Sequence, residues 1–198
     1  MQDIPSLEDF RMQAAAFISD AVNSKDACPA YGAILPPLLH EQAMHWQRFC
    51  FEKGWAGVHW PTEYGGMGLT PAHNVVWHEE CAIAEVAPYL NLQGLVLAGE
   101  AILRSGTQQQ RDRFLRATLR NEILWCQLFS EPGAGSDLAG LQTSAVVDGD
   151  QFVLNGQKVW SSNAQFAQFG ILMARTDNDQ PKQDRKSTRL NSSHQIIS

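Results

Sequence analysis

The hydrophobic periodicity of this chain changes at Glu122, and the change indicates the fold class. Before Glu122, apolar residues recur at intervals of three and four, which is the spacing of one buried helix face. After it, strand-like segments alternate with the turn dipeptides Asp148-Gly149 and Asn155-Gly156. The sequence therefore predicts an α+β protein, with an amino-terminal helical domain (residues 1–121) followed by an incomplete antiparallel β domain (residues 122–183).

Helix-start signals divide the first domain into elements. Thr107 and Gln110 have the spacing of a capping box, and Thr70 before Pro71 suits an N-cap with proline at the first helical position. Residues 54–69 have no helical or strand period but contain large aromatic residues, which predicts an ordered loop rather than a flexible linker. The expected helices span residues 6–22, 37–52, 71–86, 90–104 and 107–120.

The second domain is expected to be an antiparallel meander. Its two turn dipeptides are the kind that two-residue hairpins favour, and each lies between apolar segments. The expected strands span residues 123–129, 143–147, 151–154 and 169–174.

Residues 184–198 fit neither domain. They begin DRKSTRLNSSH, which is polar and without a period that could bury a core face. This stretch resembles a translated sequencing adapter, so we expect it to be non-native and exclude it from fold and function. The alternative is a polar disordered tail, and the source DNA across codon 184 distinguishes the two.

Composition excludes several function classes. A hydrophobic content of 44% in 198 residues is enough for a buried core. The net charge is −6 without a basic run, which argues against nucleic-acid binding, and no apolar window is long enough for a membrane span. The four cysteines match neither a zinc site nor a disulfide framework, and no secretory signal is visible. We therefore expect reduced thiols and a cytoplasmic location.

Ionisable residues of the helical domain offer no metal or carboxylate centre. His73 and His78 are five residues apart and do not share a helix face, so a metal pair is not favoured. Glu79 and Glu80 are adjacent and point apart, which indicates a solvated helix face rather than a carboxylate dyad.

The segment from Leu124 to Ser162 contains the chemistry. The stretch Glu131 to Asp137, EPGAGSD, follows a strand, and its glycines would let backbone amides approach a ligand. It lacks the lysine of a Walker loop and the third glycine of a dinucleotide-binding motif. A tight turn joining two strands is an equally good interpretation of this stretch alone.

Two hydroxyls and one indole are the other candidate ligand groups. Ser130 and Ser162 can donate to or accept from a heteroaromatic ring, and Trp160 offers a face for stacking. Taken singly, each has an ordinary explanation, because strand serines are usually solvated and strand tryptophans usually belong to the core.

The chain resembles the amino-terminal half of an acyl-CoA dehydrogenase, a flavoprotein family. The resemblance covers most of residues 1–183 and is strongest at LFSEPGAGSDLAGLQT and NGQKVWSSNA. It implies FAD as cofactor, with Ser130 bonding the isoalloxazine ring and Ser162 near its N5 and O4 edge. It also implies that Gly135 and Ser136 lie along the acyl-CoA thioester and its pantetheine arm. The residues implied to line the flavin are Gln127, Phe129, Ser130, Trp160 and Ser162.

The activity that the resemblance implies is α,β-dehydrogenation of an acyl-CoA thioester. The catalytic base is expected in a carboxy-terminal domain, so no residue of this chain is assigned that role. The expected partners are an acyl-CoA substrate, an electron-transfer flavoprotein and, for a full-length protein, copies of itself or of a related subunit. We expect these 198 residues alone to bind FAD poorly and to have no turnover.

Two alternatives remain open at this point. A relative of the same fold could deliver flavin electrons to oxygen, as acyl-CoA oxidases and flavin-dependent monooxygenases do. The chain could also be a non-catalytic helical interaction module, although two clusters of polar residues, the first from Ser130 to Ser136 and the second from Trp160 to Ser162, argue against that class.

Overall fold

The computed structural model describes residues 4–32 and 34–176. Helices lead and a small sheet region follows, which confirms the predicted fold class. The elements in chain order are α1 (Leu7–Ser24), α2 (His40–Glu52), α3 (Pro71–Ile83), α4 (Gly99–Ser105), α5 (Gln108–Leu119), β1 (Trp125–Leu128), β2 (Ser144–Asp148), β3 (Gln151–Asn155) and β4 (Phe169–Leu172). Short 3-10 turns lie at Pro37–Leu39, Thr62–Tyr64 and Leu138–Gly140, and a π-helical turn lies at Gly94–Ala98.

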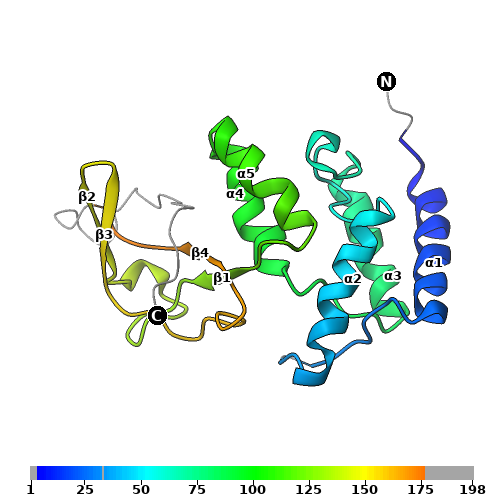
Figure 1. The fold of residues 1–198 in the computed structure, drawn as a ribbon, viewed down its shortest axis with the longest axis horizontal. Coiled ribbons are helices and arrows are strands. Elements are labelled where there is room, and N and C mark those ends of the chain that lie inside the picture. The colour runs from blue at the N-terminus through cyan, green and yellow to red at the C-terminus, as the bar shows by residue number, and fades with distance from the viewer. Residues whose placement is uncertain (1–3, 33, 177–198) are drawn as a thin grey trace.

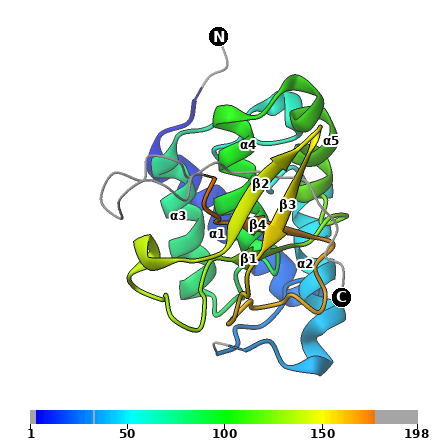
Figure 2. The ribbon, with the colours of Figure 1, turned by 90° about the vertical axis from the view of Figure 1, so that its left-hand side faces the viewer.

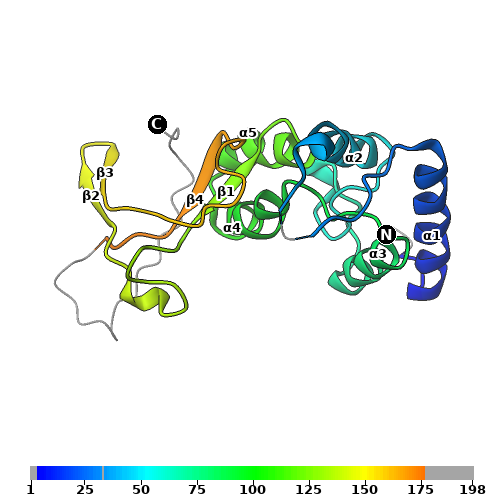
Figure 3. The same cartoon turned by 90° about the horizontal axis from the view of Figure 1, so that it is seen from below.

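The molecule is elongated, with its helices at one end and its strands at the other (Figure 1). The helices α1, α2 and α3 form one end, α4 and α5 lie in the middle, and the β2–β3 hairpin is farthest from α1 (Figures 1 and 3). Viewed from the strand end, the hairpin stands in front of the helices (Figure 2). Among the described residues, no helix combines the length and apolar character needed to cross a membrane.

Side chains cap two helices, α1 and α5. The Ser6 hydroxyl accepts a hydrogen bond from the Asp9 backbone amide at 3.1 Å. Thr107 and Gln110 form both hydrogen bonds of the predicted capping box. Thr70 differs, because its hydroxyl lies 2.7 Å from the His73 Nδ1 and makes no capping bond to the backbone of α3.

The single helix expected over residues 90–104 is divided. It begins with the π turn Gly94–Ala98 and becomes regular only in α4. Its glycines pack tightly: a Cβ on Gly94 would lie 2.4 Å from the Asn91 Oδ1, and one on Gly99 would lie 2.3 Å from the Trp60 ring. Hydrophobic spacing does not reveal these backbone approaches, so the sequence predicted one uninterrupted helix.

Aromatic side chains fill the helical core. The largest include Trp46, Trp60 and Trp77, each 1% exposed. Since Trp60 comes from residues 54–69, that loop is ordered, as predicted. The prediction of a solvated face holds for Glu79, which is exposed, but is wrong for Glu80, which is buried; both carboxylates pair with Arg11 of α1.

The sheet region contains two separate strand pairs. The β2–β3 pair is an antiparallel hairpin, as predicted, but its two-residue turn is Gly149-Asp150 rather than Asp148-Gly149, because Asp148 pairs with Gln151. The second hairpin, at Asn155-Gly156, is not formed: β3 ends at Asn155, and a Cβ on Gly156 would lie 2.3 Å from the Thr143 Oγ1. Strands β1 and β4 pair in parallel, with Trp125 opposite Phe169, so the expected continuous meander is absent from the described residues.

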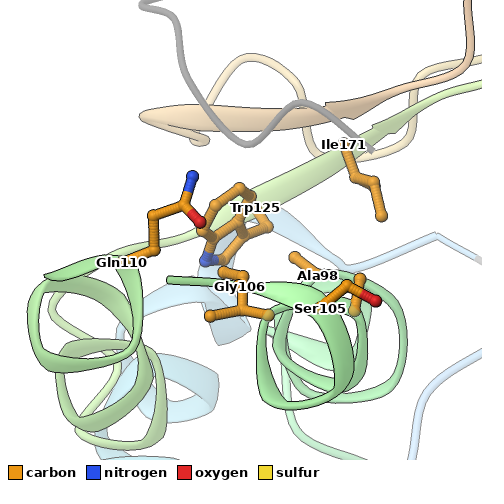
Figure 4. A pocket seen from close by; sticks show the side chains of 8 residues that line it. Ala98, Ser105, Gly106, Gln110, Trp125 and Ile171 are labelled. Carbon is orange, nitrogen blue, oxygen red and sulfur yellow. The ribbon is translucent and has the colours of Figure 1, made fainter. Parts of the chain in front are cut away.

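The β1–β4 pair packs on α4 and α5. Trp125 of β1 and Ile171 of β4 point toward the helices, where Ala98, Ser105 and Gly106 face them (Figure 4). A cavity of about 40 Å³ remains between these side chains. It is too small for a cofactor and marks the junction of helices and strands.

Candidate functional site

The first polar cluster follows β1 directly. Phe129 packs against the core, Ser130 is half-buried, and the chain then turns sharply between Glu131 and Ala134. Two backbone bonds close this turn, from the Glu131 amide at 2.8 Å and from the Ala134 amide at 3.1 Å. The stretch is therefore a tight turn, and its glycines face open space, since a Cβ on Gly133 would meet no atom within 4 Å.

The second cluster presents an exposed indole. Trp160 is 89% exposed and has a φ of 58°, in the left-handed region that non-glycine residues rarely occupy. The Ser162 amide donates to the Trp160 carbonyl at 3.0 Å, and the Ser162 side chain is also exposed. The ordinary explanation of Trp160 as a core residue therefore does not hold in this structure.

A backbone hydrogen bond joins the two clusters. The Val159 amide donates to the Ser130 carbonyl at 2.9 Å, although the two residues are far apart in sequence. Next to it, Lys158 donates to the Phe129 carbonyl at 2.9 Å. The residues just before Trp160 therefore lie directly against Ser130.

The Glu131 carboxylate is the electrostatic centre of this region. Lys158 Nζ lies 2.8 Å from its Oε1, and the Thr143 and Gln142 amides donate to it at 2.8 and 2.5 Å. Burial by itself would raise the Glu131 pKa, but the hydrogen bonds from Lys158, Thr143 and Gln142 outweigh it and lower the pKa to about 2. Glu131 is therefore ionised throughout the physiological pH range.

Two cavities border the joined clusters. One of about 410 Å³ is lined by Ser161 and Ser162 on one side and by Tyr89, Leu90 and Gln93 of the helical region on the other. The second, of about 510 Å³, lies at the turn Glu131–Gly133 and the loop around Gln142 and Gly156.

The other predicted site residues lie around these features. Gln127 is half-buried on β1, where it pairs in register with Ile171 of β4. Gly135 and Ser136 are exposed, and neither lines the two cavities just described. The structure thus joins Phe129, Ser130 and Trp160 through their neighbours, but it does not bring Gly135 and Ser136 into the same cavity as Ser162.

Sequence reasoning missed the roles of Glu131 and Lys158. Both belong to the two quoted motifs, and their opposite charges were the available signal. Nothing in their spacing predicts contact, because 27 residues separate them and the intervening loop and hairpin must fold first.

Family models match both halves of the chain. A model described as the N-terminal domain of acyl-CoA dehydrogenase matches residues 5–122, and one described as the middle domain matches residues 126–191. The second match continues past residue 183, the end expected for the β domain.

Individual relatives agree with the family models. The acyl-CoA dehydrogenase IpdE1 of Mycobacterium tuberculosis is 41% identical over 180 residues, which are 89% of this chain and 46% of that protein. Among solved structures, the ChsE4-ChsE5 complex from Mycobacterium tuberculosis has a TM-score of 0.73 at 29% identity, covering 93% of this chain and 46% of that chain.

A more distant structure shares the fold. A glutaryl-CoA dehydrogenase from Mycobacterium smegmatis, solved in complex with FADH2, has a TM-score of 0.63 at 23% identity over 86% of this chain and 42% of its own. The chain therefore spans about half the length of the relatives that it matches.

Proposed function

This chain belongs to the acyl-CoA dehydrogenase family, and we propose that the whole protein catalyses α,β-dehydrogenation of an acyl-CoA thioester with bound FAD. The observation that carries the proposal is the hydrogen bond from Val159 to the Ser130 carbonyl. It joins the two segments whose side chains suit a flavin ring, although they are distant in sequence.

The free groups of the two segments fit a planar heteroaromatic cofactor. Within the described residues, the hydroxyls of Ser130 and Ser162 have no hydrogen-bond partner and are available to a ring nitrogen or oxygen. The exposed Trp160 indole offers a face for stacking. Gln127 and Phe129 complete this wall from the end of β1.

FAD, when bound, supplies the acceptor for the two electrons of the reaction. The chain's own residues bind and orient: Ser130 and Ser162 fix the ring edge, while Gly135 and Ser136 contact the thioester and its pantetheine arm. The cavity between Ser162, Leu90 and Gln93 is the proposed space for the acyl chain beyond the thioester. We assign the catalytic base to the carboxy-terminal part of the whole protein.

Partners and location follow the same proposal. An electron-transfer flavoprotein would accept the electrons, and the whole protein would form homo- or hetero-oligomers, as the similar ChsE4-ChsE5 complex combines two proteins. A cytoplasmic location is supported by four cysteines that are all free and buried.

Anaerobic turnover of the full-length protein tests the proposed function. We expect acyl-CoA to bleach the flavin absorbance and to yield a 2-enoyl-CoA, with electrons passing to an electron-transfer flavoprotein. A full-length protein that purifies without flavin, or that does not oxidise any acyl-CoA of a panel differing in length and branching, would overturn the proposal. In a separate assay under air, rapid oxygen uptake during acyl-CoA oxidation would identify an oxidase or monooxygenase instead.

Separate proposals concern the 198-residue chain itself. We propose that it binds FAD weakly and has no turnover alone, which stoichiometric flavin and dye-linked acyl-CoA oxidation would contradict. We also propose domain boundaries at residues 121 and 183. The non-native origin of residues 184–198, which lie outside the described residues, remains a prediction that the source DNA tests.

A further inference from the structure

A buried ion pair lies between the two segments of the proposed flavin wall. The side chains of Lys158 and Glu131 are 9% and 6% exposed, and their Nζ and Oε1 atoms are 2.8 Å apart. Neither residue has a role in the proposed function. Because charges this well buried are seldom kept without a partner, their arrangement calls for a structural explanation.

Lys158 holds the residues on both sides of Ser130. Its ammonium donates to the carbonyl of Phe129, which precedes Ser130, and to the carboxylate of Glu131, which follows it. The carbonyl of Ser130 itself accepts the amide of Val159. Lys158 and Val159, which directly precede Trp160, thus bind three consecutive residues, 129 to 131.

Glu131 extends this connection to a third segment. Its two carboxylate oxygens accept the amides of Gln142 and Thr143, where the chain enters β2. These bonds close the loop between residues 131 and 143, which carries Gly135 and Ser136. One carboxylate therefore joins the proposed flavin wall to this loop, which we call the thioester loop.

We propose that Glu131 and Lys158 are positioning residues that hold the Ser130 segment, the Trp160 segment and the thioester loop in one arrangement for cofactor and substrate. This inference deepens the proposed function and rests on it. Neither residue touches flavin or substrate in the proposal; both act through Ser130, Trp160 and the loop. Removing one partner would leave a buried charge uncompensated and open this region locally, while the helical domain stays folded.

Amide hydrogen exchange on the ¹⁵N-labelled 198-residue chain tests the connection directly. In Lys158→Met, the amides of Val159 and Thr143 should exchange at least about tenfold faster than in the wild type, because local opening becomes easier. The amide of Leu115, buried in α5, should keep its rate. The double variant with Glu131→Gln should exchange more slowly at Val159 than Lys158→Met, since no unpaired charge remains.

The matched control is Lys53→Met, which removes a positive charge from an exposed lysine in the helical region. It should leave the Val159 and Thr143 rates unchanged. Unchanged rates in Lys158→Met, or equal acceleration at Leu115, would overturn the positioning role, since the pair would then be dispensable or a general stabiliser.

An FAD titration separates this inference from the proposed function. FAD added to the wild-type chain should shift the Ser130 and Trp160 amide signals, and Lys158→Met should weaken that response at least about tenfold relative to Lys53→Met. Faster Val159 exchange together with an undiminished FAD response would overturn the positioning role. Absence of any FAD response in the wild type would instead overturn the flavin assignment, whatever the exchange rates show.

Discussion

The side-chain oxygen of Asn91 accepts the backbone N–H of Trp125 at 3.0 Å. Asn91 is fully buried in the helical region, and its amide group also donates to the carbonyls of Thr118 and Ile123 at 3.2 and 2.7 Å. One side chain thereby forms hydrogen bonds with three backbone groups in the connection from α5 to β1. The position of the proposed flavin wall relative to the helices depends on this contact.

Asn91→Ala should lower the free energy of unfolding by about 2–4 kcal/mol, because it leaves buried backbone donors and acceptors unpaired. Chemical denaturation of the 198-residue chain measures this change. Asn155→Ala, at an exposed asparagine of β3, is the control and should change the free energy by less than about 0.5 kcal/mol. Equal effects of the two substitutions would contradict the connecting role of Asn91.

Gly99→Ala should destabilise the protein by about 1–3 kcal/mol, because the added methyl group would lie 2.3 Å from buried ring carbons of Trp60. Gly133→Ala adds the same group at an open position without a positive φ and should be close to neutral. Thermal unfolding of both variants provides the comparison. Equal melting temperatures would show that the helix shifts away from Trp60 without loss.

The ion pair of Glu131 predicts acid sensitivity of the strand region. Because the folded-state pKa is lowered from 4.5 to about 2, its stabilising contribution is fully present above pH 4.5 and is lost as the pH falls toward 2. Amide exchange at Val159, expressed relative to Leu115, should therefore accelerate over this range. In Glu131→Gln this pH dependence should be absent, and its persistence would assign it to another group.

Trp160→Gly should separate stability from flavin binding. The side chain is 89% exposed and glycine accepts the φ of 58° freely, so the free energy of unfolding should change by less than about 1 kcal/mol. In the full-length protein the same change should lower the flavin content. Trp125→Ala, at a tryptophan 1% exposed, should instead cost about 3–5 kcal/mol. Full flavin content in Trp160→Gly would exclude a stacking role.

Local signals in the sequence were sufficient for most helices. The capping box at Thr107 and the apolar spacing of residues 6–22 depend on neighbours within one or two turns, and both are found in the structure. The π turn at Gly94–Ala98 was missed because Gly94 packs closely against Trp125, and Gly99 after the turn against Trp60; both tryptophans are distant in sequence.

Long-range pairing limited the prediction of the strand region. The β2–β3 hairpin is local and was predicted with its turn one residue too early, whereas the parallel pairing of β1 with β4 joins segments more than forty residues apart. Residue types suggested the chemistry of Ser130, Trp160 and Ser162, but not the Glu131–Lys158 pair between them. Two oppositely charged residues that are distant in sequence can be assigned to one site only when the fold is known to bring them together.

The most direct test of the central claim is an NMR titration of FAD into the ¹⁵N-labelled 198-residue chain. The claim is that the segments around Ser130 and Trp160 form one face of a flavin site. It predicts weak binding in which the amide signals of Ser130, Trp160 and Ser162 shift together with a single dissociation constant. Shifts confined to the helical region, or no shifts at millimolar FAD, would contradict it.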